Sequence, residues 1–199
     1  LAGGYFSRGQ YSTALDEIKL ALAAKPDMGA AYNMRGLVYA AMGEERLAEE
    51  SFERAMQLNP RDADAMHNRA WFKCQRGQHD EADRLFEQAI ATPQYRELSR
   101  SLMAQGICNA RAGRMVPAEQ KLLRAYEVDP TNPTTAYNLA DVLYRRNELE
   151  RARFYVRRIN DREVPISSSP LNSIIVFGGR IDALVLQQSI NNRAVSILS

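Results

Sequence analysis

Small apolar residues recur along the chain at an interval of 34 residues, as Ala14, Ala48 and Ala82 show. Bulky apolar residues accompany them at matching positions, and polar or charged residues fill much of the space between. Such a pattern indicates a repeated structural unit that is shorter than an ordinary domain. One unit of this length cannot bury its own apolar face, so it needs stacked neighbours on which to pack.

The unit is clearest in residues 29–62. It predicts two antiparallel helices, A and B, that cross where Gly36 and Ala48 are small enough for the backbones to approach. Gly43 favours the left-handed conformation that ends helix A, and Pro60 stops helix B. Phe52 and the tyrosines of the unit are expected to fill the space beside neighbouring hairpins. A 34-residue interval with these markers is the tetratricopeptide signature.

We therefore predict an all-α fold, a right-handed superhelical solenoid of tetratricopeptide helix hairpins. Five repeats are expected, at about residues 1–28, 29–62, 63–96, 97–132 and 133–166. The step from Ala82 to Ala118 is 36 residues, so two extra residues should lengthen the third helix B or its turn. Asn147 stands where the other repeats have a turn glycine, and asparagine also suits a left-handed helix end.

The composition changes after Pro165. Charged residues become sparse, and an apolar run at 174–177 is followed by two glycines. Residues 167–199 are expected to form an irregular, mainly helical C-terminal cap. A degraded sixth repeat and a divergent or non-native tail are the alternatives.

Helix A builds the inner, concave wall of such an array, and its side chains there suit an extended segment or an amphipathic helix of a protein partner. Tryptophan and tyrosine often dominate binding energy, so Trp71 is the strongest single candidate. The alternative is that several of these residues are buried between repeats. The predicted partner-binding groove consists of Phe6, Asn33, Leu37, His67, Trp71, Met103, Ile107, Tyr137, Asp141 and Tyr144.

The bulk properties are those of a soluble, folded protein, with 25% charged and 45% hydrophobic residues. A net charge of +2 is too small to favour nucleic acid as a partner. Arginines do gather in the fifth repeat, but acidic residues interleave with them, so most should lie on solvated helix faces. No apolar run approaches the roughly 20 residues that span a bilayer. We expect a protein partner and no nucleic acid.

The sequence offers little for catalysis. His67 and His79 are the only histidines, and neither lies in an HExxH motif or beside a nucleophile motif. Neither a glycine-rich phosphate loop nor a paired metal-ligand spacing is present. We predict no enzyme activity, no cofactor and no metal. Zinc held by Cys74, Cys108 and the histidines is the alternative for the metal.

Two segments carry a more specific resemblance. Residues 92–108, TPQYRELSRSLMAQGIC, contain Tyr95 and the Glu-x-Ser-Arg element of Glu97, Ser99 and Arg100. Residues 139–155 are LADVLYRRNELERARFY. Both resemble the type IV pilus biogenesis and stability lipoproteins called PilW or PilF, in which such an element leads into the fourth helix A. The resemblance covers about residues 1–163.

The resemblance implies a periplasmic pilotin, anchored in the outer membrane by a lipid, that helps the pilus secretin assemble. The lipidated cysteine of that family would lie upstream of Leu1, so the membrane would be reached only through an anchor outside this chain. Function and location both follow from the resemblance alone.

Cys74 and Cys108 fall at positions 12 and 10 of adjacent A helices. This offset is under one turn, about 3 Å along the axis, so the two Cα atoms should lie within the roughly 4.4–6.8 Å that a disulfide needs. If the resemblance holds, the periplasm would oxidise them. Two buried free thiols are the alternative.

We thus expect a non-enzymatic scaffold that binds a secretin subunit or another pilus component. A generic adaptor of another envelope or cytoplasmic assembly pathway is the second hypothesis. A regulatory domain of an enzyme is the third.

Overall fold

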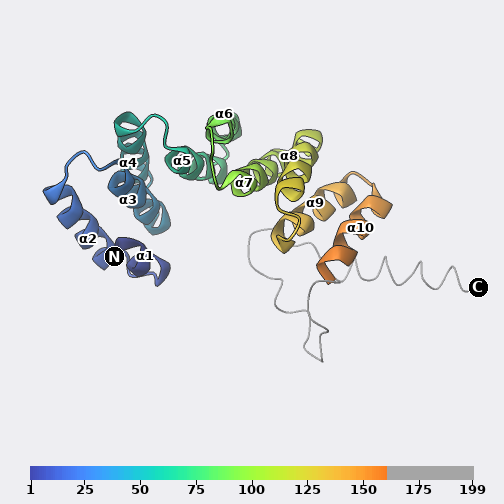
Figure 1. Cartoon of the computed structure of the whole chain (residues 1–199), viewed down its shortest axis with the longest axis horizontal. Coiled ribbons are helices and arrows are strands. Elements are labelled where there is room, and N and C mark those ends of the chain that lie inside the picture. The colour runs from blue at the N-terminus through green and yellow to red at the C-terminus, as the bar shows by residue number, and fades with distance from the viewer. Residues whose placement is uncertain (161–199) are drawn as a thin grey trace, which may run out of the picture.

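The computed structural model describes residues 1–160, which form ten α-helices and no strand (Figure 1). The helices follow one another along a single row from the N-terminus to the last described residues. The expected cap at 167–199 lies outside the described residues. In chain order the helices are α1 (Ala2–Ser7), α2 (Tyr11–Ala24), α3 (Gly29–Met42), α4 (Glu45–Leu58), α5 (Ala63–Gln75), α6 (His79–Ala91), α7 (Leu98–Arg111), α8 (Met115–Val128), α9 (Pro133–Arg145) and α10 (Leu149–Asn160).

Consecutive helices pair as hairpins, α1 with α2 through to α9 with α10, and each hairpin packs on the next. Odd-numbered helices are the A helices and even-numbered ones the B helices. This arrangement confirms the predicted all-α, right-handed superhelical solenoid of tetratricopeptide hairpins.

The turn inside each hairpin uses the predicted left-handed residue. Gly43 has φ 79° at the end of α3, and its backbone N–H donates back to Ala40 O. Asn147, which replaces the glycine in the last hairpin, has φ 63°. Asparagine therefore takes over the conformation that glycine provides in the other repeats.

The hairpins cross closely because a small residue of helix A faces a large residue of helix B. A Cβ added to Gly36 would lie 2.6 Å from the ring of Phe52, and one added to Gly106 would lie 2.6 Å from Leu122 Cγ. Both partners are fully buried. These two glycines therefore fix the distance between α3 and α4 and between α7 and α8.

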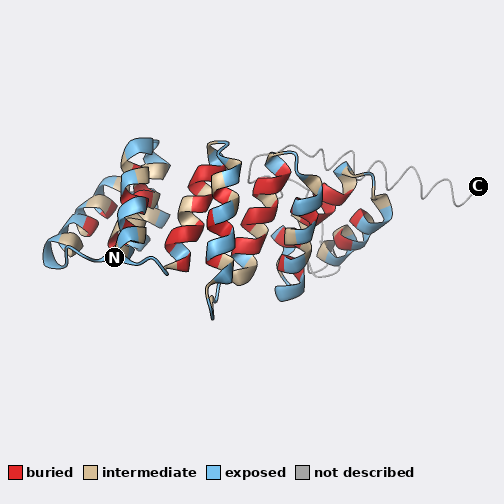
Figure 2. Cartoon of the chain, turned by 90° about the horizontal axis from the view of Figure 1, so that it is seen from above, coloured by how far each residue is buried: buried red, intermediate tan, exposed pale blue. Residues whose placement is uncertain are grey.

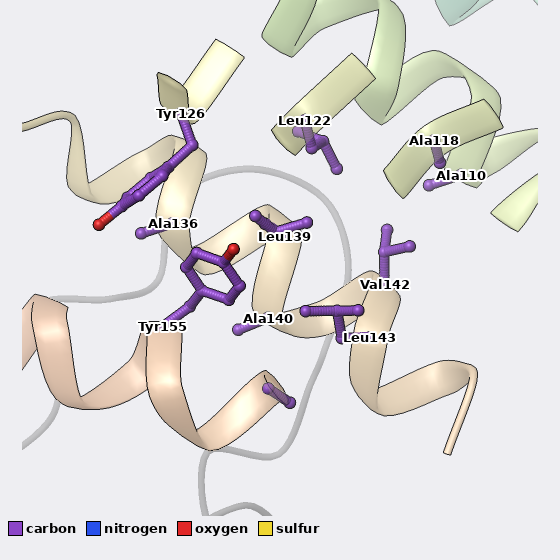
Figure 3. Packing of buried hydrophobic residues seen from close by; sticks show 11 residues of the cluster. Ala110, Ala118, Leu122, Tyr126, Ala136, Leu139, Ala140, Val142, Leu143 and Tyr155 are labelled. Carbon is purple, nitrogen blue, oxygen red and sulfur yellow. The ribbon is translucent and has the colours of Figure 1, made fainter. Parts of the chain in front are cut away.

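Buried residues run through the interior of the row of helices, with exposed residues on its outside (Figure 2). The largest cluster extends from α7 to α10 and includes Ala110, Leu122, Leu139 and Tyr155 (Figure 3). The rings of Tyr126 and Tyr155 pack edge to face with centroids 5.1 Å apart. Stacking of neighbouring repeats thus supplies the core that one hairpin lacks.

The two extra residues of the third repeat lie in the turn after its helix B. Six residues, 92–97, separate α6 from α7, whereas four separate α4 from α5 and α8 from α9. Gln94 in this longer turn has φ 60°, which is uncommon for a residue other than glycine. The helices themselves keep their usual length.

Contacts between repeats are uneven. Along the described chain, the backbones of neighbouring A helices lie close together from α1 to α9. Neighbouring B helices approach each other only through side chains, such as Tyr126 of α8 and Tyr155 of α10. The row is therefore tighter on the side of the A helices, which places them on the inner face of the curve.

Polar contacts also join neighbouring repeats. The residue after each crossing alanine of α4, α6 and α8 is acidic and meets polar side chains of the following repeat. The acids and these partners are Glu49 with Arg69 and Lys73, Asp83 with Gln105 and Asn109, and Glu119 with Arg146 and Arg151.

Candidate protein-binding surface

Equivalent positions of four successive A helices form two rows on the inner face. Every residue of the two rows except His67 is partly exposed, and so is Tyr144 of α9. The structure therefore brings most of the predicted groove together on α3, α5, α7 and α9. One row consists of Leu37, Trp71, Ile107 and Asp141, and the other of Asn33, His67, Met103 and Tyr137.

The apolar members of these rows lie half in the core and half in solvent. Leu37 packs against the cluster of Phe52 and Phe72, and Trp71 packs against the cluster around the two cysteines. A second molecule could complete the burial of these side chains, which is the usual source of binding energy at a protein interface. We define the inner strip as Leu37, Trp71, Met103, Ile107, Tyr137 and Tyr144.

Phe6 contributes to the first hairpin as much as to the surface. Its ring centroid lies 5.9 Å from that of Tyr11, and both rings pack against the core of α2 and α3. Phe6 remains partly exposed, so it extends the predicted surface only at the edge of the array.

Trp71 is held by a charged neighbour from the next repeat. The guanidinium of Arg111 lies 5.0 Å from the centroid of the Trp71 ring, which is within the range of a cation–π interaction. Arg111 itself is exposed at the end of α7. The surface around the tryptophan therefore carries a positive charge.

The α9 end of the surface combines a carboxylate with a phenol. Burial raises the pKa of Asp141, and Arg145, whose Nη1 lies 3.7 Å from Asp141 Oδ2, opposes that rise. Burial also raises the pKa of Tyr137, and the charge of Asp141 raises it further. Both groups are placed to give a hydrogen-bonding edge to the apolar strip.

His67 does not belong to the binding surface, which corrects the prediction. It is only 5% exposed, and its Nδ1 lies 2.8 Å from Ser101 Oγ of α7. The Ser101 hydroxyl donates to Tyr95 Oη, which in turn donates to Asp64. The tautomer of His67 decides whether its Nδ1 donates to the Ser101 hydroxyl or accepts from it. The chain of hydrogen bonds links α5, the long turn and α7.

A polar ladder across three A helices was not predicted from the sequence. Asn68 Nδ2 donates to Asn33 Oδ1 at 3.1 Å, and Arg100 Nη2 donates to Asn68 Oδ1 at 3.1 Å. Asn68 lies one position beyond the residue that is equivalent to Asn33, so counting by repeats did not select it. Pairing polar residues across neighbouring A helices would have found it.

The structure joins Cys74 of α5 to Cys108 of α7 in a disulfide, with Cα atoms 5.8 Å apart. Both residues are 2% exposed. His79, the first residue of α6, places its Nδ1 3.4 Å from Cys108 Sγ. Of the two histidines that were considered with these cysteines as alternative zinc ligands, His79 is the one that the structure places beside them.

Among residues 1–160, every helix is too short or too polar to cross a membrane.

Comparison with known families identifies the repeats. Residues 29–62, 51–84 and 73–133 each match a family model described as tetratricopeptide repeat. Together these matches run without a gap from residue 29 to residue 133.

Comparison with single proteins points to a narrower group than the repeat models do. The type IV pilus assembly protein PilF of Pseudomonas aeruginosa is 25% identical over 152 residues, which cover 76% of this chain and 60% of PilF. The crystal structure of PilW, a widely conserved type IV pilus biogenesis factor, has a TM-score of 0.76 at 29% identity and covers 81% of this chain and 74% of its own.

A solved structure of Pseudomonas aeruginosa PilF has a TM-score of 0.81 at 22% identity, covering 98% of this chain and 83% of its own. At 22% identity, the similarity of the two structures shows that they share a fold. The matched segment spans 60% of the length of the curated relative.

Proposed function

This chain is a tetratricopeptide repeat protein that resembles type IV pilus biogenesis factors, and on that premise we propose that it is a pilotin-like scaffold that binds a secretin subunit. The observation that carries the proposal is the inner strip, which runs across four successive A helices with its apolar side chains half exposed. Its side chains suit binding rather than catalysis, so the proposed function is non-enzymatic.

The chemistry of the surface favours a particular kind of segment. Aliphatic and aromatic side chains of a helix or an extended strand would complete the burial of the strip. Arg100, Arg111 and Arg145 are exposed beside it, and they favour acidic residues flanking the apolar ones. A segment bound in this way would be hidden from self-association until the subunit reaches its place of assembly.

The proposed location is the periplasmic face of the outer membrane, reached through a lipid anchor upstream of this chain. Resemblance to the pilus lipoproteins supports this location. The disulfide between Cys74 and Cys108 supports it as well, because structural disulfides persist in oxidising compartments.

Substitution of Trp71 tests the proposed surface. Trp71→Ala is expected to weaken secretin binding by about 2 kcal/mol or more, because half-buried tryptophans at interfaces commonly contribute this much. Calorimetry with purified secretin segments would measure the loss, and circular dichroism would check that the fold is kept. Leu20→Ala is the matched control, since Leu20 is 67% exposed on α2, away from the inner face.

Two results would count against the proposal. Unfolding of Trp71→Ala without a separable loss of binding would place Trp71 in the core. A pull-down from envelope extract that recovers a strip-dependent partner other than secretin would favour an adaptor in another assembly pathway.

A further inference from the structure

Three helices bring soft metal ligands together at the junction of the third and fourth repeats. Cys74 comes from the end of α5, His79 from the start of α6 and Cys108 from the last turn of α7. Their Sγ and imidazole nitrogen atoms all lie within 4.8 Å of one another. None of the three ligands belongs to the inner strip, although Trp71 of that strip packs against the cluster around the two cysteines. The binding function proposed above does not require a metal here.

We propose that the dithiol form of the protein binds a zinc ion through Cys74 Sγ, Cys108 Sγ and His79 Nδ1. Thiolate sulfur and imidazole nitrogen are the ligands that zinc prefers in proteins. The three helices would supply three protein ligands, and a water molecule would complete the tetrahedron.

The observed geometry fits a zinc tetrahedron with little movement. With Zn–S of about 2.3 Å and Zn–N of about 2.0–2.1 Å, the tetrahedral edge between a sulfur and a nitrogen is about 3.6 Å. The distance between His79 Nδ1 and Cys108 Sγ is 3.4 Å. The corresponding edge between two sulfurs is about 3.8 Å, which two thiols on Cα atoms 5.8 Å apart can reach by side-chain rotation.

The surroundings also suit a metal ion. Both cysteines are 2% exposed, so the sulfurs are screened from competing water. His79 is partly exposed, which leaves an approach from solvent beside its ring.

Zinc and the disulfide would exclude each other. Binding converts two thiols and a neutral imidazole into a zinc dithiolate and releases two protons. Forming the disulfide instead removes two electrons and two protons from the same thiols, so it needs a two-electron acceptor such as a disulfide oxidoreductase. A newly made chain carries the thiols and requires no reductant to bind metal. The ion would hold α5, α6 and α7 together before oxidation.

A spectroscopic titration tests the site. The protein is reduced, freed of reductant without oxygen and titrated with Co²⁺, which reports tetrahedral thiolate coordination by its visible and charge-transfer bands. We expect saturation at one Co²⁺ per chain, displacement by Zn²⁺ and no bands for the oxidised protein. His79→Ala should weaken binding by about tenfold or more, whereas Gln78→Ala, a change of the exposed neighbouring residue, should leave it unchanged.

A second measurement does not depend on a variant. Imidazole nitrogen resonances of His79 in the reduced wild-type protein should shift at Nδ1 when Zn²⁺ is added. Absence of charge-transfer bands in the reduced protein would overturn the proposal. So would binding that is equal in wild type and a folded His79→Ala, or an unchanged His79 spectrum, because either result would leave a site made of thiols alone.

Discussion

The buried imidazole of His67 makes the stability of the folded protein depend on pH. Burial, together with the smaller effect of the nearby charge of Arg100, lowers its pKa from 6.5 to about 3. The folded state therefore holds the imidazole neutral where the unfolded chain would protonate it. The stability that the neutral imidazole contributes is fully present above pH 6.5, and it is lost as the pH falls from 6.5 toward about 3.

Denaturant unfolding at several pH values would measure this effect. Between pH 6 and pH 4, the wild type should lose up to about 1.4 kcal/mol more per pH unit than His67→Asn. Asparagine is the residue at the equivalent position of the second repeat, Asn33. His79→Asn is the control and should keep the wild-type slope. Equal slopes for wild type and His67→Asn would show that His67 is protonated within the folded protein.

His67 also shows where prediction from the sequence ends at the scale of a residue. The repeat position was identified correctly, because the 34-residue interval places His67 opposite Asn33. The exposure of its side chain was not predicted correctly, because that exposure depends on the neighbouring repeat. Ser101 of the following repeat and the ring of Phe86 contact the imidazole. Tyr95 in the long turn hydrogen-bonds to both Ser101 and Asp64, and the interval does not specify the geometry of that turn.

At the scale of an element, the crossing of two helices strictly limits the size of the side chain at the crossing point. An alanine methyl at position 106 would lie 2.6 Å from Leu122 Cγ and 3.1 Å from the carbonyl oxygen of Ala118. The backbone oxygen cannot rotate away, so α7 and α8 would have to separate. Overpacking of this kind costs about 1–3 kcal/mol, which outweighs the gain of about 1 kcal/mol from replacing a helical glycine.

Gly106→Ala is therefore expected to lower the free energy of unfolding by up to about 2 kcal/mol, the cost of overpacking less the gain in helix propensity. Thermal and denaturant unfolding would measure the change. Gly4→Ala is the matched control, since its methyl would meet only the flexible end of Arg8 at 3.8 Å. Higher stability for Gly106→Ala would show that the crossing can widen freely.

The junctions between hairpins depend on buried amides. Gln105 Nε2 and Asn109 Nδ2 of α7 both donate to Asp83 Oδ1 of α6 at 2.9 Å, and both residues are less than 5% exposed. Asp83→Ala removes an acceptor from two buried donors. A loss of about 1–3 kcal/mol is expected, since an unsatisfied buried group keeps its full desolvation penalty.

Chemical denaturation of Asp83→Ala would give the value, with Asp80→Ala on the same helix as the control. Asp80 pairs with Arg114 at the surface, and exposed ion pairs contribute little, so its loss should be much smaller. Comparable losses for the two variants would mean that solvent reaches Gln105 and Asn109.

Some features of the helices and their junctions could be predicted from the sequence, and others could not. Helix hairpins, their left-handed ends and the crossing glycines follow from local residue preferences, and the sequence analysis found them. The polar junctions were missed because acids such as Asp83 and Glu119 lie on strongly amphipathic helices, where charges ordinarily face solvent. Aligning the repeats offers a signal, since an acid follows the crossing alanine in three of them.

At the scale of the whole molecule, each repeat is stabilised mainly by its neighbours. The junction of the third and fourth repeats has the longest turn between helices B and A, and the disulfide crosses this junction. Closing a loop of 34 residues stabilises the folded state by about 3–4 kcal/mol through the entropy of the unfolded chain. The inner strip runs over the same junction, from Trp71 to Ile107, so its shape depends on how firmly the two repeats are joined.

Reduction is therefore expected to loosen the middle of the array before its described ends. Amide hydrogen exchange should rise most in α5 and α7, which carry Cys74 and Cys108, and less in α3 and α9, because neighbours of a solenoid are coupled only through shared interfaces. The double variant Cys74→Ala/Cys108→Ala is the control and should not respond to reductant. Alkylation of the native protein without reductant, followed by mass spectrometry, should find neither cysteine modified. Two alkylated cysteines would mean that the repeats are joined by packing and polar contacts alone, and would remove the disulfide as support for a periplasmic location.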